Sequence, residues 1–306
     1  MLELLGKTNI DFIGKRYFAF LFSGLLVVLG IASLISISLG KANLGIDFAG
    51  GTAVQLKFEH PVRIEQAREI LEKNELRDAE LQEFSEGNKL LIRIKKLTTI
   101  QEKVAERVVS VFTRELPNNH FVIDSSEEIG PTIGQKLRQD ATLAVGIAML
   151  GIIIYIAIRF EFRFGVAAAI ATFHDVLAVL GIFFLLHREI NLLIVTALLT
   201  LAGYSLTDTV VVFDRIRENL RFRNKETLEQ VINNGINQVL SRTIVVSLTV
   251  FLVLLALFFF GGEVIHDFSF ALLIGVVVGT YSSIFVASPI LVIWKGSRGR
   301  LLRRGA

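Results

Sequence analysis

Six long apolar stretches constrain this chain of 306 residues more than any other feature of its sequence. A helix needs about 20 consecutive apolar residues to cross the hydrocarbon core of a bilayer. The stretches that approach or exceed this length are residues 17–38, 141–158, 164–186, 190–213, 243–260 and 268–294. Hydrophobic residues make up 52% of the chain, which argues against a purely soluble enzyme. The sequence therefore predicts a polytopic α-helical membrane protein with six transmembrane helices.

The spacing of these stretches predicts one helix, a large polar domain and then five helices. The first stretch is longer than the apolar core of a signal peptide, which runs about 7–15 residues, so we expect an uncleaved anchor. The expected parts are an N-terminal segment at 1–16, the first helix at 17–38, the polar domain at 39–140, helices two to six within 141–294, an amphipathic segment at 214–242, and a basic tail at 295–306.

The placement of Lys and Arg predicts the orientation of the chain. Sixteen of them flank the helices on the side of the termini, whereas the short loops of the opposite side hold only Arg188. By the positive-inside rule, both termini are expected in the cytosol and the polar domain outside. Residues 37–139 hold 15 Lys and Arg against 16 Asp and Glu, so we expect no nucleic-acid partner. The chain has no Cys, which excludes disulfides and thiol catalysis, and we expect neither a metal nor a cofactor.

The polar domain alternates between strand and helix patterns. The expected strands are residues 53–58, 79–84, 89–95 and 120–125, and the expected helices are 63–73 and 98–116. Residues 85–88 read as the turn of a hairpin. The order βαββαβ predicts a ferredoxin-like α+β domain. It contains no catalytic constellation, so we expect no enzyme.

Ionisable residues inside the apolar stretches are the strongest functional signal. A charge at the centre of a transmembrane helix costs about 2.5–3.5 kcal/mol, so it indicates a partner, a cavity or a proton path. Asp208 lies six residues before Asp214, or about 9 Å inside that end of the fourth stretch. Arg242 directly precedes the fifth stretch. Asp208 and Arg242 suit a proton path, and they equally suit a static buried pair that fixes two helices.

Other residues of the apolar stretches have a structural alternative as well. His174 and Asp175 lie near the middle of the third stretch, where a hydrogen bond that locks helices is the commoner role. Asp214 fits a cap or a loop charge. Gly275 and Gly279 form a GxxxG pattern, which favours close helix packing. The apolar positions of residues 227–242 predict an amphipathic segment that lies on the inner membrane surface.

Several motifs resemble those of the SecF family, the smaller subunits of the bacterial SecD–SecF protein-export complex. GIDFAGGT at 45–52 contains Gly45, Asp47, Gly50 and Gly51, and IGPTIG at 129–134 contains Gly130 and Pro131. AGYSLTDTVVVFDRIREN at 202–219 surrounds Asp208, and LSRT at 240–243 contains Arg242. The resemblance covers nearly the whole chain, and the motif at 202–219 is the most specific of the four.

The resemblance also implies a superfamily, a location, site residues and partners for this chain. The family belongs to the resistance-nodulation-division superfamily of proton-driven transporters, in the bacterial inner membrane, with a periplasmic ferredoxin-like domain. Its proton-path aspartate matches Asp208 and its functional arginine matches Arg242, with Asp214, Asp175 and His174 as further candidates. The implied partners are SecD, the SecYEG translocon with its associated membrane subunits, exported unfolded polypeptides, and protons.

Two other functions stay open on the sequence. One is a non-conducting scaffold that stabilises the translocon, because a static pair of Asp208 and Arg242 would leave the same motifs. The other is a subunit of another proton-coupled transporter of the superfamily, although its efflux members carry larger external domains. The resemblance implies that the chain uses the proton-motive force, together with SecD, in late steps of polypeptide export after the SecA ATPase step.

Overall fold

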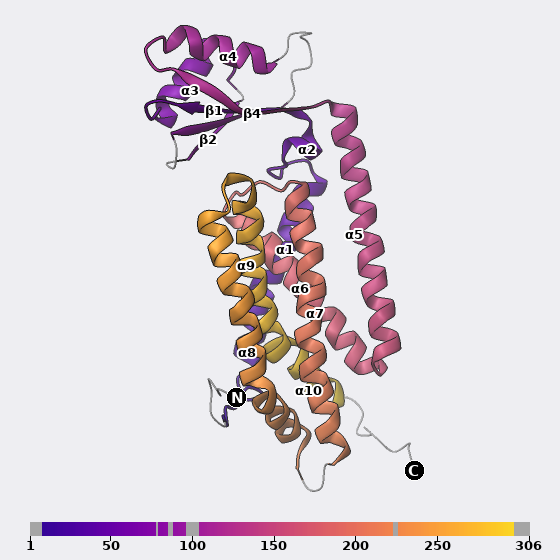
Figure 1. Cartoon of the computed structure of the whole chain (residues 1–306). Coiled ribbons are helices and arrows are strands. Elements are labelled where there is room, and N and C mark those ends of the chain that lie inside the picture. The colour runs from indigo at the N-terminus through magenta and orange to yellow at the C-terminus, as the bar shows by residue number, and fades with distance from the viewer. Residues whose placement is uncertain (1–7, 78, 85–87, 96–103, 223–225, 297–306) are drawn as a thin grey trace. The chain divides into compact units, whose positions relative to one another are not determined.

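The computed structural model describes residues 8–77, 79–84, 88–95, 104–222 and 226–296. The chain divides into two compact units. The sheet domain consists of Leu44–Leu143 and Glu189–Leu192, and the helical unit consists of the chain up to Asn43, Ala144–Arg188 and the chain from Leu193 onward. Figure 1 shows the elements of both units.

Six helices of the described residues are long and apolar enough to cross a membrane, which confirms the predicted number. They are α1 (Arg16–Ser38), α5 (Pro131–Arg159), α6 (Phe162–Leu185), α7 (Leu192–Arg221), α8 (Leu228–Phe260) and the succession of α9 (Glu263–Ser282), the π-helical turn η1 (Ser283–Ala287) and α10 (Ser288–Gly296). The chain is therefore a multi-pass membrane protein.

The helix ends differ from the expected apolar stretches. Helix α5 begins at Pro131, ten residues before the apolar run, because proline suits the first helical turn and the following polar residues continue the helix. Helix α7 continues to Arg221. Helix α8 begins at Leu228 behind a capping box, in which Thr227 and Gln230 satisfy each other's backbone N–H groups. Polar helical ends extend these helices beyond the apolar runs that define a membrane span.

The apolar residues at the start of α8 pack against α7. They were expected on the membrane surface, and Ile232 and Ile236 are fully buried in a cluster that also contains Phe213 and Ile216 of α7. Gly235 allows this approach, because a Cβ there would lie 2.9 Å from Ile216 Cγ1. The amphipathic pattern therefore corresponds to packing against protein, and the position of this segment relative to the membrane surface stays a prediction.

Small residues bring several helices of the helical unit close together. A Cβ at Gly275 would lie 2.6 Å from Leu201 Cδ1, and one at Gly279 would lie 3.1 Å from Ser205 Cβ. The GxxxG pattern of α9 therefore packs against α7, as predicted. Gly30 of α1 and Gly181 of α6 make a second close approach, because a Cβ at Gly181 would lie 2.7 Å from the Gly30 nitrogen.

The sheet domain confirms the ferredoxin-like prediction. Its strands β1 (Gly51–Phe58), β2 (Ala79–Phe84), β3 (Lys89–Ile94) and β4 (Phe121–Ile129) form an antiparallel sheet of order β2-β3-β1-β4. Helices α3 (Ile64–Lys73) and α4 (Val104–Glu115) pack on one face of it (Figure 1). Leu56, Ile92 and Phe112 are fully buried in the core between them. The predicted turn at 85–88 and the predicted helix start at 98 fall largely outside the described residues.

Gly51 is where the sheet most clearly requires glycine. Its φ of +145° is rarely adopted by other residues, and a Cβ there would lie 2.4 Å from the carbonyl oxygen of Ile94. We expect Gly51→Ala to lower the local opening free energy of the β1–β3 ladder by about 1–3 kcal/mol. Hydrogen–deuterium exchange of the full-length chain measures this as faster exchange in β1 and β3.

Gly130→Ala is the matched control, because a Cβ at Gly130 meets nothing within 4 Å and its φ lies outside the left-handed region. Equal exchange in the two variants would contradict the requirement for glycine at position 51.

Candidate functional site

Asp175 of α6 is a fully buried carboxylate inside the helical unit. Its Oδ2 accepts hydrogen bonds from the hydroxyls of Ser205 on α7 and of Ser282 on α9, the latter at 2.8 Å. Its Oδ1 lies 2.8 Å from Nδ1 of His174. Because the partners come from three helices, this carboxylate ties α6, α7 and α9 together.

Asp208 of α7 lies in a separate polar group one turn beyond Ser205, and it is 5% exposed. Its Oδ2 accepts a hydrogen bond of 3.3 Å from the hydroxyl of Ser247 on α8. Ser247 is in turn 2.7 Å from the hydroxyl of Thr280 on α9. Among the described residues, the hydrogen bonds to this carboxylate come from a hydroxyl and not from a cation.

Helix α9 takes part in both polar groups, because Ser282 donates to Asp175 and Thr280 is hydrogen-bonded to Ser247, the donor to Asp208. The π-helical turn η1 follows directly, and within it the carbonyl of Ser283 accepts a hydrogen bond of 2.8 Å from Ser288. Single π-turns inside α-helices frequently occur at functional sites. The sequence did not predict a role for these hydroxyl residues. The signal that could have identified them is the presence of polar residues in otherwise apolar helices.

Arg242 is not brought to Asp208. It is exposed on α8, five residues before Ser247. The ion pairs found among the described residues do not include one between Arg242 and Asp208. The static buried pair that the sequence left open is therefore absent from this structure.

Asp214 lies inside α7 and not at a helix cap or in a loop. Its Oδ2 accepts a hydrogen bond of 2.5 Å from Nη2 of Arg159, at the end of α5, and both side chains are partly exposed. The neighbouring Arg215 donates to Gln238 of α8 and to Glu218 of its own helix. Asp214 thus joins two helices of the helical unit near their ends.

The glycine motifs meet in the sheet domain although about 80 residues separate them in sequence. A Cβ at Gly50 would lie 3.0 Å from the Cα of Pro131, and one at Gly134 would lie 2.9 Å from the nitrogen of Gly50. Between them, Asp47 lies in the short helix α2 (Ile46–Ala49). These motifs therefore form one compact junction where β1 begins and α5 begins.

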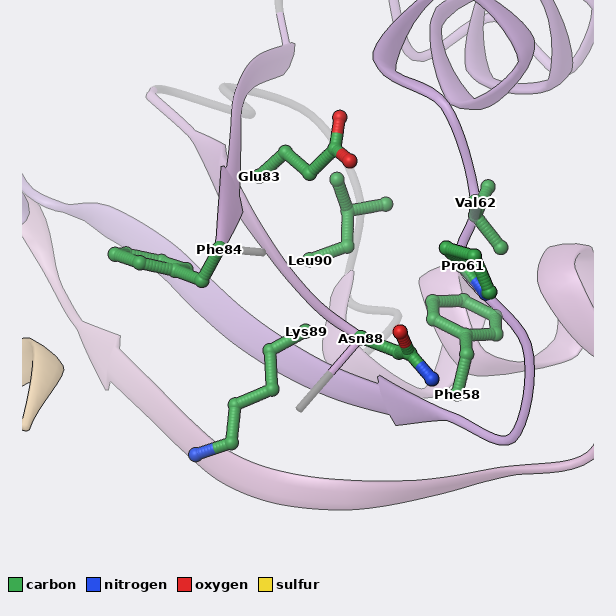
Figure 2. A pocket seen from close by; sticks show the side chains of 8 residues that line it. All are labelled: Phe58, Pro61, Val62, Glu83, Phe84, Asn88, Lys89 and Leu90. Atoms are coloured by element: carbon green, nitrogen blue, oxygen red, sulfur yellow. The ribbon is translucent and has the colours of Figure 1, made fainter. Parts of the chain in front are cut away.

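The sheet domain also has a small hollow of about 220 Å³ at one end of the sheet. Figure 2 shows its lining residues: Phe58, Pro61, Val62, Glu83, Phe84, Asn88, Lys89 and Leu90. The Lys89 side chain extends away from Pro61 and Val62 in this view, and its ammonium group pairs with Asp124 at 2.8 Å. The lining mixes five apolar residues with Glu83, Asn88 and Lys89, and Lys89 pairs with Asp124 outside the hollow, so the helical unit holds the better candidate site.

Six membrane-length helices among the described residues, a ferredoxin-like domain after the first of them and buried carboxylates in the bundle define a multi-pass membrane protein with polar groups inside its helical unit. A family model described as "Protein export membrane protein SecD/SecF, C-terminal" matches residues 108–297, and the "SecD/SecF GG Motif" model matches residues 36–62. The chain belongs to the SecD/SecF family of protein export membrane proteins.

Similar proteins support this membership over the full length. The chain is 52% identical to the protein translocase subunit SecF of Thermodesulfovibrio yellowstonii, covering 96% of this chain and 97% of the relative. It is 43% identical to the SecF of Calditerrivibrio nitroreducens, covering 98% and 99%. The crystal structure of SecDF from Thermus thermophilus, a translocon-associated membrane protein, superposes with a TM-score of 0.83 at 35% identity. That match covers 94% of this chain and 39% of the SecDF chain.

Proposed function

We propose that this chain is the SecF subunit of a protein translocase and that, together with SecD, it uses the proton-motive force in late steps of polypeptide export, after the SecA ATPase step. The observation that carries the proposal is Asp208, a carboxylate held in the helical unit by the hydroxyl of Ser247. A hydroxyl can accept or donate, so this partner suits both protonation states of the acid. Asp208 is the proposed proton carrier.

Arg242 has a different role in the proposal from that of Asp208. Its exposed position on α8 leaves the guanidinium on the surface of this chain, available to a second subunit. The solved SecDF chain is more than twice as long as the part that this chain matches, which supports a SecD half as that partner. We place Arg242 at the contact through which SecD and this subunit complete the proton path.

In this proposal, the other candidate residues from the sequence have structural roles. Asp175 and His174 hold three helices together, and Asp214 joins α5 and α7 through Arg159. The chain carries no hydrolytic chemistry of its own and works in the bacterial inner membrane, with cytosolic termini and the sheet domain in the periplasm. Its further partners are the SecYEG translocon, its associated membrane subunits and unfolded polypeptides.

The energy available is sufficient for such a role. One elementary charge that crosses a potential of 100 mV releases about 2.3 kcal/mol. This free energy biases a two-state equilibrium by about fiftyfold, provided that the two states differ in how they bind the proton. Repeated over many cycles, the bias gives a direction to the movement of an exported chain.

A reconstitution experiment tests the proposed function. Vesicles with SecYEG and SecD, with or without this subunit, receive SecA, ATP and a preprotein, and export is measured with the proton gradient intact or dissipated by an uncoupler. We expect stimulation by the gradient to be several-fold larger when this subunit is present. Equal stimulation with and without the subunit would contradict the proposal and favour a scaffold that stabilises the translocon.

A further inference from the structure

The end of the loop between α6 and α7, together with the first residue of α7, belongs to the sheet domain. This segment is Glu189–Leu192, and it follows α6 in sequence. Leu44 and Ile190 form a parallel β-bridge, and the backbone N–H of Gly45 donates to the carbonyl of Ile190 at 2.9 Å. The backbone of the 189–192 segment is therefore paired directly with the start of the GIDFAGGT motif.

An ion pair adds a second connection. Arg93 Nη1, on β3, lies 2.7 Å from Glu189 Oε2, and the Glu189 side chain is only 7% exposed. Burial raises the pKa of Glu189 above its usual value, and the positive charge of Arg93 opposes this shift. A carboxylate this deeply buried depends on its cationic partner, because removal of either residue leaves an uncompensated charge.

Asp47 makes the third connection, to helix α7 itself. Its Oδ2 accepts a hydrogen bond of 2.9 Å from the backbone N–H of Leu192, the first residue of α7. A carboxylate at this position accepts from a backbone N–H group of the first turn and interacts favourably with the helix dipole.

Gly45 leaves the space that this arrangement needs. A Cβ there would lie 2.4 Å from Glu189 Oε1 and 2.9 Å from the Cβ of Asn191. The first glycine of the motif is thus explained by the closeness of the 189–192 segment. Backbone pairing, an ion pair, a helix cap and a small residue all fix the same four residues.

We propose that the 189–192 segment couples the sheet domain to helix α7, so that the two move together during export. From Leu192, α7 runs without interruption past Asp208, sixteen residues or about 24 Å along the helix. A displacement of α7 that accompanies proton exchange at Asp208 is then passed to the sheet domain through this segment. Asp47 and Arg93 are its positioning residues. The inference rests on the proposed function of Asp208.

A charge swap tests the ion pair in the complete complex with SecD and SecYEG. We expect Arg93→Glu or Glu189→Arg alone to lower the gradient-dependent part of export about tenfold, and the double variant to return within about twofold of wild type. Export driven by SecA and ATP without a gradient stays unchanged in all three variants. Lys73→Glu is the control, because it reverses a charge in the exposed pair of Lys73 and Glu115 on the helices of the same domain.

A disulfide supplies a second test that does not depend on how well the charge variants fold. The chain has no Cys, so Leu44→Cys with Ile190→Cys introduces the only thiols. Paired strands lie about 4.8 Å apart, within the range that a disulfide spans. If the segment around Leu44 and the 189–192 segment move as one, oxidation of the cysteine pair leaves gradient-dependent export unchanged.

Three results would overturn the coupling proposal. One is a double charge variant that assembles yet stays as inactive as the single variants. Another is single charge variants that are as active as Lys73→Glu. The third is a loss of export on oxidation of the cysteine pair that a reductant restores, since this would show that the junction must open. An Asp208→Asn variant measured alongside separates the two proposals. If Asp208→Asn loses the gradient-dependent part of export while the charge variants keep it, only the coupling proposal is contradicted.

Discussion

Asp208→Asn is expected to abolish the gradient-dependent part of export while the complex remains assembled. The amide has nearly the same size as the carboxyl group and can still accept the hydrogen bond from Ser247, so the packing of α7 against α8 is retained. The amide cannot take up and release a proton in the physiological range. The variant therefore separates proton exchange from structure.

The measurement compares wild type and Asp208→Asn in vesicles that contain SecD and SecYEG, with the gradient intact and dissipated. We expect the difference between the two conditions to fall at least about tenfold, because proton exchange at a single obligatory carrier cannot be bypassed. Export supported by SecA and ATP alone should stay at the wild-type level. Co-purification of SecD with the variant verifies assembly.

Glu218→Gln is the matched control for this variant. It makes the same change from acid to amide on the same helix, at an exposed side chain that pairs with Arg215. Its gradient-dependent export should equal that of wild type. Normal stimulation by the gradient in Asp208→Asn would remove Asp208 from the proton path and leave the scaffold function as the better account.

The helices could be predicted from the sequence because length and apolar composition determine which segments cross a membrane. The ends of α5, α7 and α8 could not, since their polar turns lie outside the apolar runs and depend on helix-forming residues and caps. The order of strands and helices in the sheet domain also followed from periodicity. The short helix α2 was missed, because four residues in a glycine-rich motif carry no periodic signal.

The site was predictable only in part. A charged residue in an apolar run indicates a buried functional group, and both Asp175 and Asp208 are indeed buried. The partner of Asp208 was not predictable, because it depends on the rotation and depth of α8. Ser247 lies five residues, about 7.5 Å along the helix, from Arg242, and it is Ser247 that meets the carboxylate. The link between Asp47 and Leu192 was equally hidden, since 145 residues separate them in sequence.

Asp175→Ala is the variant that we expect to destabilise the helical unit most. It removes the shared acceptor of Ser205 and Ser282 and the neighbour of His174, all in a site that water does not reach. Each buried donor left without a partner costs about 1–3 kcal/mol, so we expect a loss of about 3 kcal/mol or more. Thermal unfolding of the purified subunit in detergent measures the change.

Asp175→Asn distinguishes a structural carboxylate from a second proton carrier. Its amide oxygen still accepts hydrogen bonds from the two serines, so we expect a smaller loss of stability than in Asp175→Ala and gradient-dependent export within about twofold of wild type. An Asp175→Asn variant that unfolds like wild type but loses gradient-dependent export would place Asp175 on the proton path. The hydroxyls of Ser205 and Ser282 would then be proton-handling groups, and α9 would carry two such sites on either side of Tyr281.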